Sequence, residues 1–516
     1  MVAPRVGVAS FVGRVRSEGL RFMESLSLVT KAEAKCDLPI RALQFGEGNF
    51  LRGFIDWMIF KANQKGLFNG RVLALQCTPR GRVVPKLKAQ DGLYTTILHG
   101  VDEKGAEHEE IEVINTIAAA LNPYEAWEPV LAAAMSPELK FVFSNTTEAG
   151  ITYAPEQAFN TDVCPETYPG KLTAILHERF KAGLPGLWVV PCELLDNNGT
   201  LLKEIVLKHA AEQGLGADFE QYVKTQCRFI NTLVDRVVSG YPKDNAAEVE
   251  AKLGYKDELM TCGETFHFLA LEGDEEVSRE LPFAAAGLNV VVAPDITPYR
   301  LRKVRILNGT HTSNVPAAFL AGLDTVDQMM SDPVTGKFAR SVIYDEIIPA
   351  VNLDKEMLVS FADDVVKRFS DPSMHHQLAS ILMNSTSKVK ARVLPTILDA
   401  RAKGILPKKL CFALAAYIAL YHGSTGLPVK VSRAEGKSGE FMDDAYAAEV
   451  MTKAWSVYQK TEASALFTVK TVLSDTKLWD CDLSSDVDLT ALVARLLHAI
   501  ISDGVIATMK DLLEHN

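Results

Sequence analysis

The sequence lacks several features that mark particular classes of protein. It contains no run of about 18 uninterrupted apolar residues, the length that a membrane-spanning helix needs. Its eight cysteines form no Cys-x-x-Cys pair, which argues against a zinc knuckle and a disulfide framework and favours a reducing, cytoplasmic location. It has no excess of basic residues: the net charge is -11, so we expect neither nucleic acid nor an anionic membrane as a partner.

Other absences concern architecture and metals. No internal repeat of solenoid period and no low-complexity segment is present. No histidine has a partner at metal-ligand spacing, so we predict no metal site. The length of 516 residues suffices for two or three domains with large cores. Residues 1–38 mix acidic and basic side chains without the apolar core of a signal peptide, and we expect an N-terminal extension there.

Residues 39–294 alternate between strand and helix patterns. The first unit is a buried strand, Ile40–Phe45, then a glycine turn, then a helix from Phe50 to about Lys65. This alternation predicts a mostly parallel sheet in an α/β domain. The further strands expected are Val72–Gln76, Tyr94–Leu98, Ile111–Ile114, Phe141–Phe143, Trp188–Val190, Thr232–Val238 and Leu288–Val292, with helices at Tyr124–Ala134, Lys171–Ala182 and Leu201–Glu212.

Residues 295–516 show almost no strand pattern, and we expect a mostly α-helical domain. The loop His422–Glu440, which is rich in glycine and serine, is expected to be exposed. The predicted helices are Val315–Leu323, Ser341–Val351, Lys355–Phe369, His376–Met383, Leu410–Tyr421, Ala445–Val457 and Leu489–Leu513.

The glycine turn Gly46-Glu-Gly48 follows a predicted strand and opens a predicted helix, which is the context of a dinucleotide-binding fingerprint. The first glycine would make the tight turn, and the second would let a pyrophosphate approach the backbone. Leu51 stands where the usual third glycine would be, and simple strand–helix turns show the same partial pattern. The second strand ends in Gln76 rather than an acidic residue, with Arg80 beyond it, so the choice between NAD and NADP stays open.

A second candidate site lies at the start of the helical region. Thr297 and Pro298 predict a capped helix that carries Lys303, Asn308 and His311. At about 100° per residue, His311 falls about 80° and Asn308 about 140° from Lys303, so the three side chains can converge. Lysine can transfer a proton, asparagine can hold an oxygen and histidine can orient a hydroxyl. A solvated basic helix face is the alternative.

Four motifs together resemble the polyol-specific long-chain dehydrogenases/reductases, the mannitol 2-dehydrogenase family. They are Gly46-x-Gly48-x-Phe50-x-Arg52, the run SNTTEAG at 144–150, Val234-Asp-Arg236, and Lys303-x4-Asn308-x2-His311, in the family's order. The resemblance covers nearly everything from residue 39 onward. It implies a Rossmann-type domain, a helical domain, an active site between them, and metal-independent hydride transfer between a nicotinamide and a ketose or polyol carbon.

The resemblance also implies roles for individual residues. Lys303 would be the catalytic acid/base, Asn308 would hold the reacting oxygen, His311 would orient the substrate and Asp235 would contact it. Burial is expected to lower the pKa of Lys303, and the charges of Arg300, Arg302 and Arg305 could add to this, although we expect at least two of these arginines to point outward to solvent instead. The residues expected to bind NAD are Phe45, Gly46, Glu47, Gly48, Asn49, Phe50, Leu51, Arg52, Gln76, Thr146 and Glu148.

One family feature is missing. Family members have an asparagine soon after a Cys-Asp pair, whereas this chain reads Cys192-Glu193-Leu194. Either Asn308 holds the oxygen alone, or another group such as Asn198 completes the oxygen pocket.

The finer sequence runs resemble the family branch that acts on hexuronates. A hexuronate carries a carboxylate, for which His376 and Lys388, together with Lys390 and Arg392, are candidate cations, and Glu264 is an acid near the cleft. The alternatives are a sister enzyme that acts on another hexuronate or on mannitol, an NAD-retaining epimerase or isomerase, and a non-catalytic sugar-binding relative. We expect a small-molecule substrate and either a monomer or a homodimer.

Overall fold

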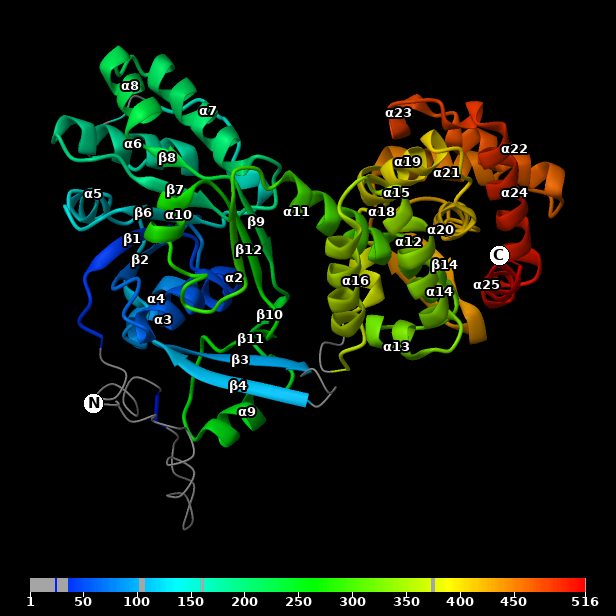
Figure 1. The fold of residues 1–516 in the computed structure, drawn as a ribbon, viewed down its shortest axis with the longest axis horizontal. Coiled ribbons are helices and arrows are strands. Elements are labelled where there is room, and N and C mark those ends of the chain that lie inside the picture. The colour runs from blue at the N-terminus through cyan, green and yellow to red at the C-terminus, as the bar shows by residue number, and fades with distance from the viewer. Residues whose placement is uncertain are drawn as a thin grey trace, which may run out of the picture.

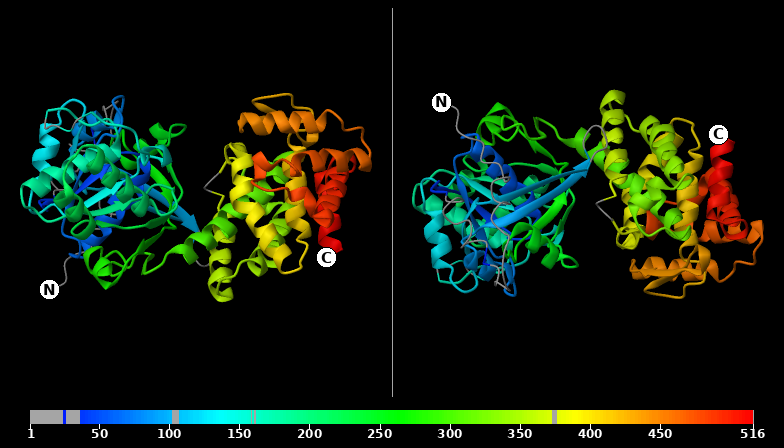
Figure 2. Two further views of the ribbon diagram at one scale, coloured as in Figure 1. Left: turned by 90° about the horizontal axis from the view of Figure 1, so that it is seen from above. Right: turned by 90° about the horizontal axis from the view of Figure 1, so that it is seen from below.

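The computed structural model describes residues 24–25, 36–101, 107–157, 159, 162–372 and 376–515. Most of the expected N-terminal extension lies outside these residues. The described chain forms an α/β lobe and a helical lobe, with helix α11 (Thr297–Arg302) between them (Figures 1 and 2). This confirms the expected fold class, a Rossmann-type domain followed by a mostly helical domain.

A six-stranded, wholly parallel sheet forms the centre of the α/β lobe, in the order β5-β2-β1-β6-β7-β8. Side chains on successive residues of a strand point to opposite faces, and both faces of this sheet are covered by helices. Ala42 thus packs on the side of α3 and Leu43 on the side of α6. The strands are β1 (Ile40–Phe45), β2 (Arg71–Leu75), β5 (Ile117–Leu121), β6 (Phe141–Ser144), β7 (Trp188–Pro191) and β8 (Arg228–Phe229).

Helices on both faces and two smaller sheets complete the lobe. One face of the main sheet carries α3 (Ile55–Gln64) and α4 (Val83–Ala89), and the other carries α5 (Glu128–Ala134), α6 (Tyr168–Lys181), α7 (Asn198–Glu212) and α8 (Ala217–Thr225). The second sheet has the order β10-β11-β3-β4, from β3 (Tyr94–Val101), β4 (Glu107–Ile114), β10 (Val238–Gly240) and β11 (Thr261–Glu264). The third has the order β13-β12-β9, from β9 (Thr232–Asp235), β12 (Phe268–Glu272) and β13 (Val290–Ala293).

The expected strand Thr232–Val238 is wrong as a single element, because it is interrupted at Arg236. The guanidinium of Arg236 turns inward and donates hydrogen bonds to the backbone oxygens of Gly53, Thr265 and Phe266, at 2.7 to 3.1 Å. The chain therefore leaves the third sheet at Asp235 and enters the second at Val238, which leaves Asp235 at a strand end.

The helical lobe packs around α20 (Lys408–Ala419), whose residues 409–419 are all buried between α12 (Gly309–Leu320) and α24 (Val487–Ser502). The other helices are α13 (Val326–Ser331), α14 (Thr335–Ser341), α15 (Ile348–Ala350), α16 (Lys355–Phe369), α17 (Leu378–Leu382), α18 (Ser385–Lys388), α19 (Leu394–Ala402), α21 (Ala445–Trp455), α22 (Glu462–Leu473), α23 (Thr476–Trp479) and α25 (Val505–Glu514).

Two predictions for this lobe are wrong. The segment Leu489–Leu513 is not one helix, because Gly504 takes a φ of +92° and separates α24 from α25. The segment His422–Glu440 is not merely a loop, because it carries β14 (Val429–Ser432), which pairs with β15 (Ser438–Phe441). Val429 and Val431 alternate with exposed residues and bury their side chains in the core.

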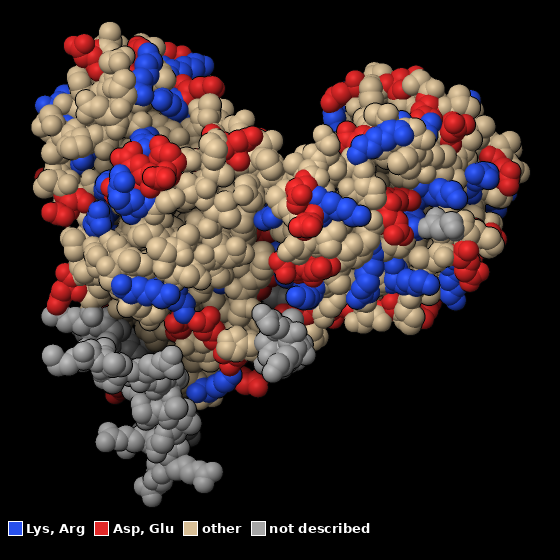
Figure 3. Space-filling view, viewed as in Figure 1, with Lys and Arg blue, Asp and Glu red and all other residues tan. Residues whose placement is uncertain are grey.

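The surface charges and the cysteines place few constraints on the function of the protein. Acidic and basic side chains are intermixed on the face of the helical lobe in Figure 3. All eight cysteines are free. Among the described residues, no helix combines the length and apolarity needed to cross a bilayer, and no group of three or more histidine, cysteine or acidic residues is arranged to hold a metal ion.

Candidate active site

Lys303 lies where the two lobes meet, and its side chain is only 12% exposed. Its Nζ donates a hydrogen bond to the backbone oxygen of Val234 at 2.7 Å and lies 3.7 Å from Oδ1 of Asp235. Burial lowers the pKa of Lys303, against the opposing charge of Asp235. The guanidinium groups of Arg368 and Arg392 lower it further. Lys303 is therefore placed to lose its proton more readily than an exposed lysine.

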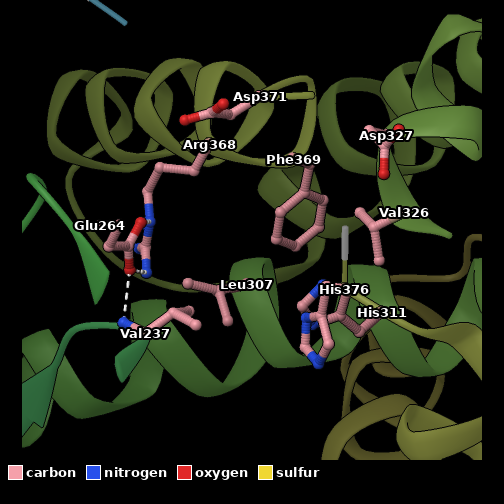
Figure 4. Close-up of a pocket in the computed structure, with 10 residues that line it drawn as sticks. All are labelled: Val237, Glu264, Leu307, His311, Val326, Asp327, Arg368, Phe369, Asp371 and His376. Carbon is pink, nitrogen blue, oxygen red and sulfur yellow. Dashed lines mark hydrogen bonds and ion pairs between the residues drawn. The ribbon is translucent and has the colours of Figure 1, made fainter. Parts of the chain in front are cut away.

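Arg368, on α16 of the helical lobe, binds two carboxylates of the α/β lobe beside Lys303. Its Nη1 and Nη2 each donate to one oxygen of Asp235 at 3.1 Å, and its Nε and Nη2 donate to Glu264 at 2.9 and 2.7 Å (Figure 4). Burial favours protonated Asp235, but Lys303 and Arg368 outweigh it and hold the pKa of Asp235 below its usual value. Asp235 therefore stays ionised and orients the ammonium of Lys303.

The segment that carries Lys303 and Asn308 is a π-helix, η4 (Lys303–Asn308), rather than the expected α-helix. A π-helix pairs residue i with residue i+5, so Lys303 and Asn308 lie one turn apart along the helix surface. The separation of about 140° that α-helical geometry predicts is wrong for this pair. The amide of Asn308 is half-buried and makes no hydrogen bond to the described part of the chain, so it is available to a ligand.

The start of this helix also differs from expectation. Thr297 is its first helical residue rather than its cap, and the backbone N–H of Thr297 donates to Oδ1 of Asp295 at 2.8 Å. The sequence pattern located the helix correctly to within one residue, but Asp295 supplies the capping oxygen.

His311 follows in α12 and is buried. Its ring stacks on Phe369 with the centroids 4.0 Å apart and meets His376 edge to face at 5.4 Å. Burial lowers the pKa of His311 well below its usual value, and the neighbouring cations, His376 first, act in the same direction. The ring is therefore neutral near pH 7, and its Nε2 has no hydrogen-bond partner in the described residues. Such a nitrogen can bind a substrate hydroxyl.

A basic cluster, formed by His376, Lys388 and Arg392, lies next to His311. Nη1 of Arg392 lies 3.5 Å from Oγ1 of Thr312, and Lys388 donates to a backbone oxygen in α17 at 2.8 Å. No member of the cluster forms a salt bridge within the part of the chain that the structure describes. Burial lowers the pKa of Lys388 and of Arg392. The cluster therefore offers two cations, Lys388 and Arg392, that form no salt bridge with the described residues, and the ring of His376, whose pKa burial also lowers.

The other basic residues singled out from the sequence are occupied elsewhere. The arginines whose charges most lower the pKa of Lys303 are Arg368 and Arg392, rather than Arg300, Arg302 or Arg305. Arg300 lies 3.5 Å from Asp196, Arg305 lies 2.9 Å from Asp399, Arg302 stacks on Phe361, and Lys390 lies 2.7 Å from Asp480.

Two cavities lie on either side of the Asp235–Arg368 ion pair. The first is bounded by Arg368, Phe369, His311 and His376, as Figure 4 shows. The second extends from Lys303 to the α/β lobe, where Phe50, Asn145, Thr147, Glu193 and Leu194 line it. Lys303 lines the second cavity, which reaches Phe50 in the helix that follows the glycine turn.

The glycine turn joins β1 to α2 (Asn49–Gly53) at the carboxyl end of the parallel sheet. Gly46 takes a φ of +117°, and a Cβ there would lie 2.8 Å from the backbone oxygen of Asn145. A Cβ at Gly48 would meet no atom within 4 Å. The first glycine is thus required by the backbone, and the second leaves an open surface. This shape fits the pyrophosphate of a dinucleotide.

Several residues expected to bind the cofactor support the turn from within. The guanidinium of Arg52 is buried and donates to the backbone oxygen of Glu47 and to Oδ1 of Asn49. Phe45 and Leu51 are buried in the hydrophobic core. These three buried side chains fix the shape of the turn.

Two more residues that were expected to bind the cofactor form hydrogen bonds within the protein instead. Gln76 is buried at the end of β2 and donates to the backbone oxygen of Thr78 at 2.7 Å. The backbone N–H and the hydroxyl of Thr146 both donate to Glu193 at 2.9 Å. The side chain of Glu148 lies outside the described residues.

The missing family asparagine corresponds to Leu194, which is 62% exposed in the second cavity. Asn198 does not replace it, because its amide donates to the backbone oxygens of Pro191 and Glu193 and to Oγ1 of Thr232, all within 3.1 Å. No hydrogen of that amide is left for a substrate.

Sequence reasoning missed two polar residues of the site. Asn145 lines the second cavity, and only one of its amide hydrogens has a described acceptor, the backbone oxygen of Cys192 at 2.8 Å. Arg368 follows Val365 by three residues and therefore lies on the buried stripe of α16. An arginine on an apolar stripe was the available signal for Arg368, whereas Asn145 lies within the SNTTEAG run at 144–150, a motif that by itself indicates no role for this residue.

Comparison with known proteins agrees with this geometry. Residues 40–284 match the mannitol dehydrogenase Rossmann domain, and residues 295–501 match the mannitol dehydrogenase C-terminal domain. The chain is 41% identical over 475 residues to an altronate oxidoreductase of Halalkalibacterium halodurans, covering 91% of this chain and 92% of the relative. It is 40% identical over 479 residues to an altronate oxidoreductase of an Enterobacter species, covering 92% and 97%.

Two solved structures share the fold. Mannitol 2-dehydrogenase of Pseudomonas fluorescens, in complex with NAD and D-mannitol, aligns with a TM-score of 0.69 at 22% identity, covering 93% of this chain and 95% of the other. A D-sorbitol dehydrogenase aligns with a TM-score of 0.74 at 21% identity, covering 94% and 100%.

The chain is thus an NAD-dependent oxidoreductase that acts on a CH–OH group of a polyol or sugar acid. It belongs to the mannitol dehydrogenase family.

Proposed function

We propose that this enzyme reduces the keto group of tagaturonate to give altronate, reversibly, with Lys303 as the general acid/base. The observation that carries the proposal is the buried Lys303 in a cavity that reaches Phe50 just after the glycine turn, with a second cavity next to a basic cluster that forms no salt bridge among the described residues. Relatives about 40% identical over more than nine-tenths of the chain carry the name altronate oxidoreductase, which supports the choice of substrate.

The coenzyme would lie along the second cavity, with its pyrophosphate over Gly46 and Gly48. Its reduced nicotinamide supplies a hydride to the keto carbon when bound there. Phe50 and Leu194 offer apolar surface in this cavity and would exclude water from the reacting carbon.

The protein's part in the reaction is to hold the reacting oxygen and to give it a proton. Asn308 would donate a hydrogen bond to that oxygen, and Asn145, with one amide hydrogen to spare, would supply the donor that Leu194 lacks. Protonated Lys303 would give the developing alkoxide its proton. In the reverse direction neutral Lys303 would accept the hydroxyl proton, and its lowered pKa makes that form more abundant near neutral pH.

The basic cluster would bind the substrate carboxylate. Arg392 can bind both carboxylate oxygens through its planar guanidinium, and Lys388 and His376 would add donors from the same side. His311 would hold a substrate hydroxyl through its free Nε2. The two carboxylate oxygens of Asp235 already accept hydrogen bonds from Arg368. Asp235 would therefore act on the substrate mainly by positioning Lys303.

The test is to compare kcat/KM for tagaturonate, fructuronate and fructose with NADH in the wild type and in Arg392→Met. We expect tagaturonate to be the best substrate of the wild type, and fructose, which has no carboxylate, to be the poorest. Arg392→Met should lose about ten- to a hundredfold for the uronates, because hydrogen bonds to charged groups contribute about 1.5–3 kcal/mol, and should change little for fructose. Equal losses of kcat/KM for all three substrates would exclude Arg392 as the residue that binds the substrate carboxylate.

A further inference from the structure

Glu47 is a buried carboxylate that forms no salt bridge with the described residues, although the charge of the nearby Arg52 acts on it. It is only 8% exposed, and within the described chain no side chain forms a salt bridge with it or donates a hydrogen bond to its carboxylate. Arg52 donates to the backbone oxygen of Glu47 instead. Burial raises the pKa of Glu47 above its usual value. A buried unpaired carboxylate costs free energy, so its position in the glycine turn points to a ligand.

Glu47 reaches the end of β2, although it belongs to the turn after β1. The two strands are parallel neighbours, with Phe45 paired to Leu75, and the N–H of Gly46 donates to the oxygen of Leu75 at 3.0 Å. The backbone amide of Cys77 stabilises the charged form of Glu47, which places the carboxylate against the chain just after β2. In a Rossmann fold this is where an acidic side chain binds the adenosine ribose.

The second strand itself supplies no such acid. It ends in Gln76, which is 1% exposed and donates to the backbone oxygen of Thr78. A Cβ added at Gly81 would lie 2.5 Å from the side chain of Gln76, so the following loop covers that amide. The acidic group at this position therefore comes from the neighbouring turn.

We propose that Glu47 binds the hydroxyls of the adenosine ribose and sets the preference of the enzyme for NAD over NADP. The two oxygens of the carboxylate can each accept from one hydroxyl of the ribose diol, which would add donors to the backbone amides that act on the buried group. A 2′-phosphate would instead bring negative charge against the carboxylate, with little water between them to screen the repulsion. The inference concerns coenzyme binding alone and does not depend on the identity of the sugar substrate.

The experiment measures dissociation constants of the purified full chain for NADH, NADPH and the 2′-deoxy analogue of NADH by nicotinamide fluorescence, without sugar substrate. In Glu47→Gln we expect NADH to bind about ten- to a hundredfold more weakly, since a hydrogen bond to a charged group is lost. NADPH should bind as tightly as before or more tightly, and the wild-type preference for NADH over its 2′-deoxy analogue should disappear. Glu125→Gln is the matched control, because this exposed acid adjoins Tyr124, whose hydroxyl donates to Cys77.

Thermal unfolding distinguishes a ligand-binding role from a structural one. Since burial outweighs the groups that stabilise the charge of Glu47, Glu47→Gln should leave Tm at or above the wild-type value. Equal weakening of all three coenzymes together with a lower Tm would show a structural role and overturn the proposal. Unchanged binding of NADH, or an unchanged ratio of NADH to NADPH affinity, would overturn it as well.

Discussion

Single residues decide the chemistry of this site through their surroundings. Four charged side chains alternate in sign along a chain of contacts, in the order Lys303, Asp235, Arg368 and Glu264. Arg368 binds both carboxylate oxygens of Asp235, and Oδ1 of Asp235 lies 3.7 Å from Nζ of Lys303. The arrangement keeps Asp235 ionised, while burial makes the proton of Lys303 easier to remove. An acid/base group needs this combination of fixed position and accessible neutral form.

Replacing Lys303 by alanine should lower kcat about 10²- to 10⁴-fold in both directions, the usual contribution of a positioned acid/base. Binding of NADH should change little, because the nicotinamide does not depend on the proton. Steady-state kinetics and coenzyme fluorescence measure the two effects. Lys390→Ala, which removes a lysine paired with Asp480 instead, is the matched control. Full activity in Lys303→Ala would exclude the mechanism.

The pH dependence of the two directions should be opposite. Burial lowers the folded-state pKa of Lys303, so the neutral amine is present at a lower pH than in a free lysine. Oxidation of altronate needs the neutral amine and should rise with pH through that pKa, to a plateau below the free value of about 10.4. Reduction needs the ammonium and should fall over the same interval. His311 should add no inflection near pH 6.5, since its pKa lies well below that value. Parallel profiles in both directions would contradict this assignment.

At the scale of elements, short helices position the substrate-binding cations. α18 carries Lys388 and begins after Asn384, which has a φ of +56°. Asp443 accepts hydrogen bonds from the backbone and hydroxyl of Thr386 in the first turn, at 2.9 to 3.2 Å, and from Tyr421 at 2.6 Å. This buried network fixes the start of α18 and therefore the position of Lys388.

Removing the carboxylate of Asp443 should loosen α18. We expect Asp443→Ala to raise KM for the uronate about tenfold, equivalent to about 1.4 kcal/mol of binding, and to change kcat little. The neighbouring Asp444→Ala, which removes the cap of α21 instead, should leave KM unchanged. Kinetics with tagaturonate and NADH measure both variants. An effect on kcat alone would show that Asp443 does not act through the substrate-binding helix.

The limits of sequence reasoning are also clearest at this scale. The unit of β1, glycine turn and helix was predictable because its signals lie within one short run of the chain. The π-helical form of Lys303–Asn308 was not, because Lys-Val-Arg-Ile-Leu-Asn has no proline or glycine to mark a departure from the α-helix. The partners of Arg368 lie 104 and 133 residues away along the chain, beyond any local pattern. The motif order nevertheless located Lys303, Asn308, His311 and Asp235 in one region.

At the scale of the whole molecule, Arg368 fastens the helical lobe to the α/β lobe. Its guanidinium is 9% exposed and binds two carboxylates that are 5–6% exposed. Removing one partner of a buried ion pair leaves an uncompensated charge, which costs more than the pair itself contributes.

Arg368→Met should therefore lower the free energy of unfolding by about 3–5 kcal/mol. Arg368→Met combined with Asp235→Asn and Glu264→Gln should recover part of that loss, because no unpaired carboxylate remains. Denaturant unfolding measures both. Arg279→Met removes an arginine that is 68% exposed and should change stability little. Similar stability in Arg368→Met and in Arg279→Met would contradict the role of Arg368 as the tie between the lobes.

The most direct test of the central claim is the conversion of tagaturonate by the purified enzyme with NADH. The account predicts that reduced-nicotinamide absorbance falls as altronate forms, one molecule for each NADH consumed, and that Lys303→Ala nearly abolishes the reaction while still binding NADH. Failure of the wild type to consume NADH with tagaturonate, or consumption without formation of altronate, would contradict the account.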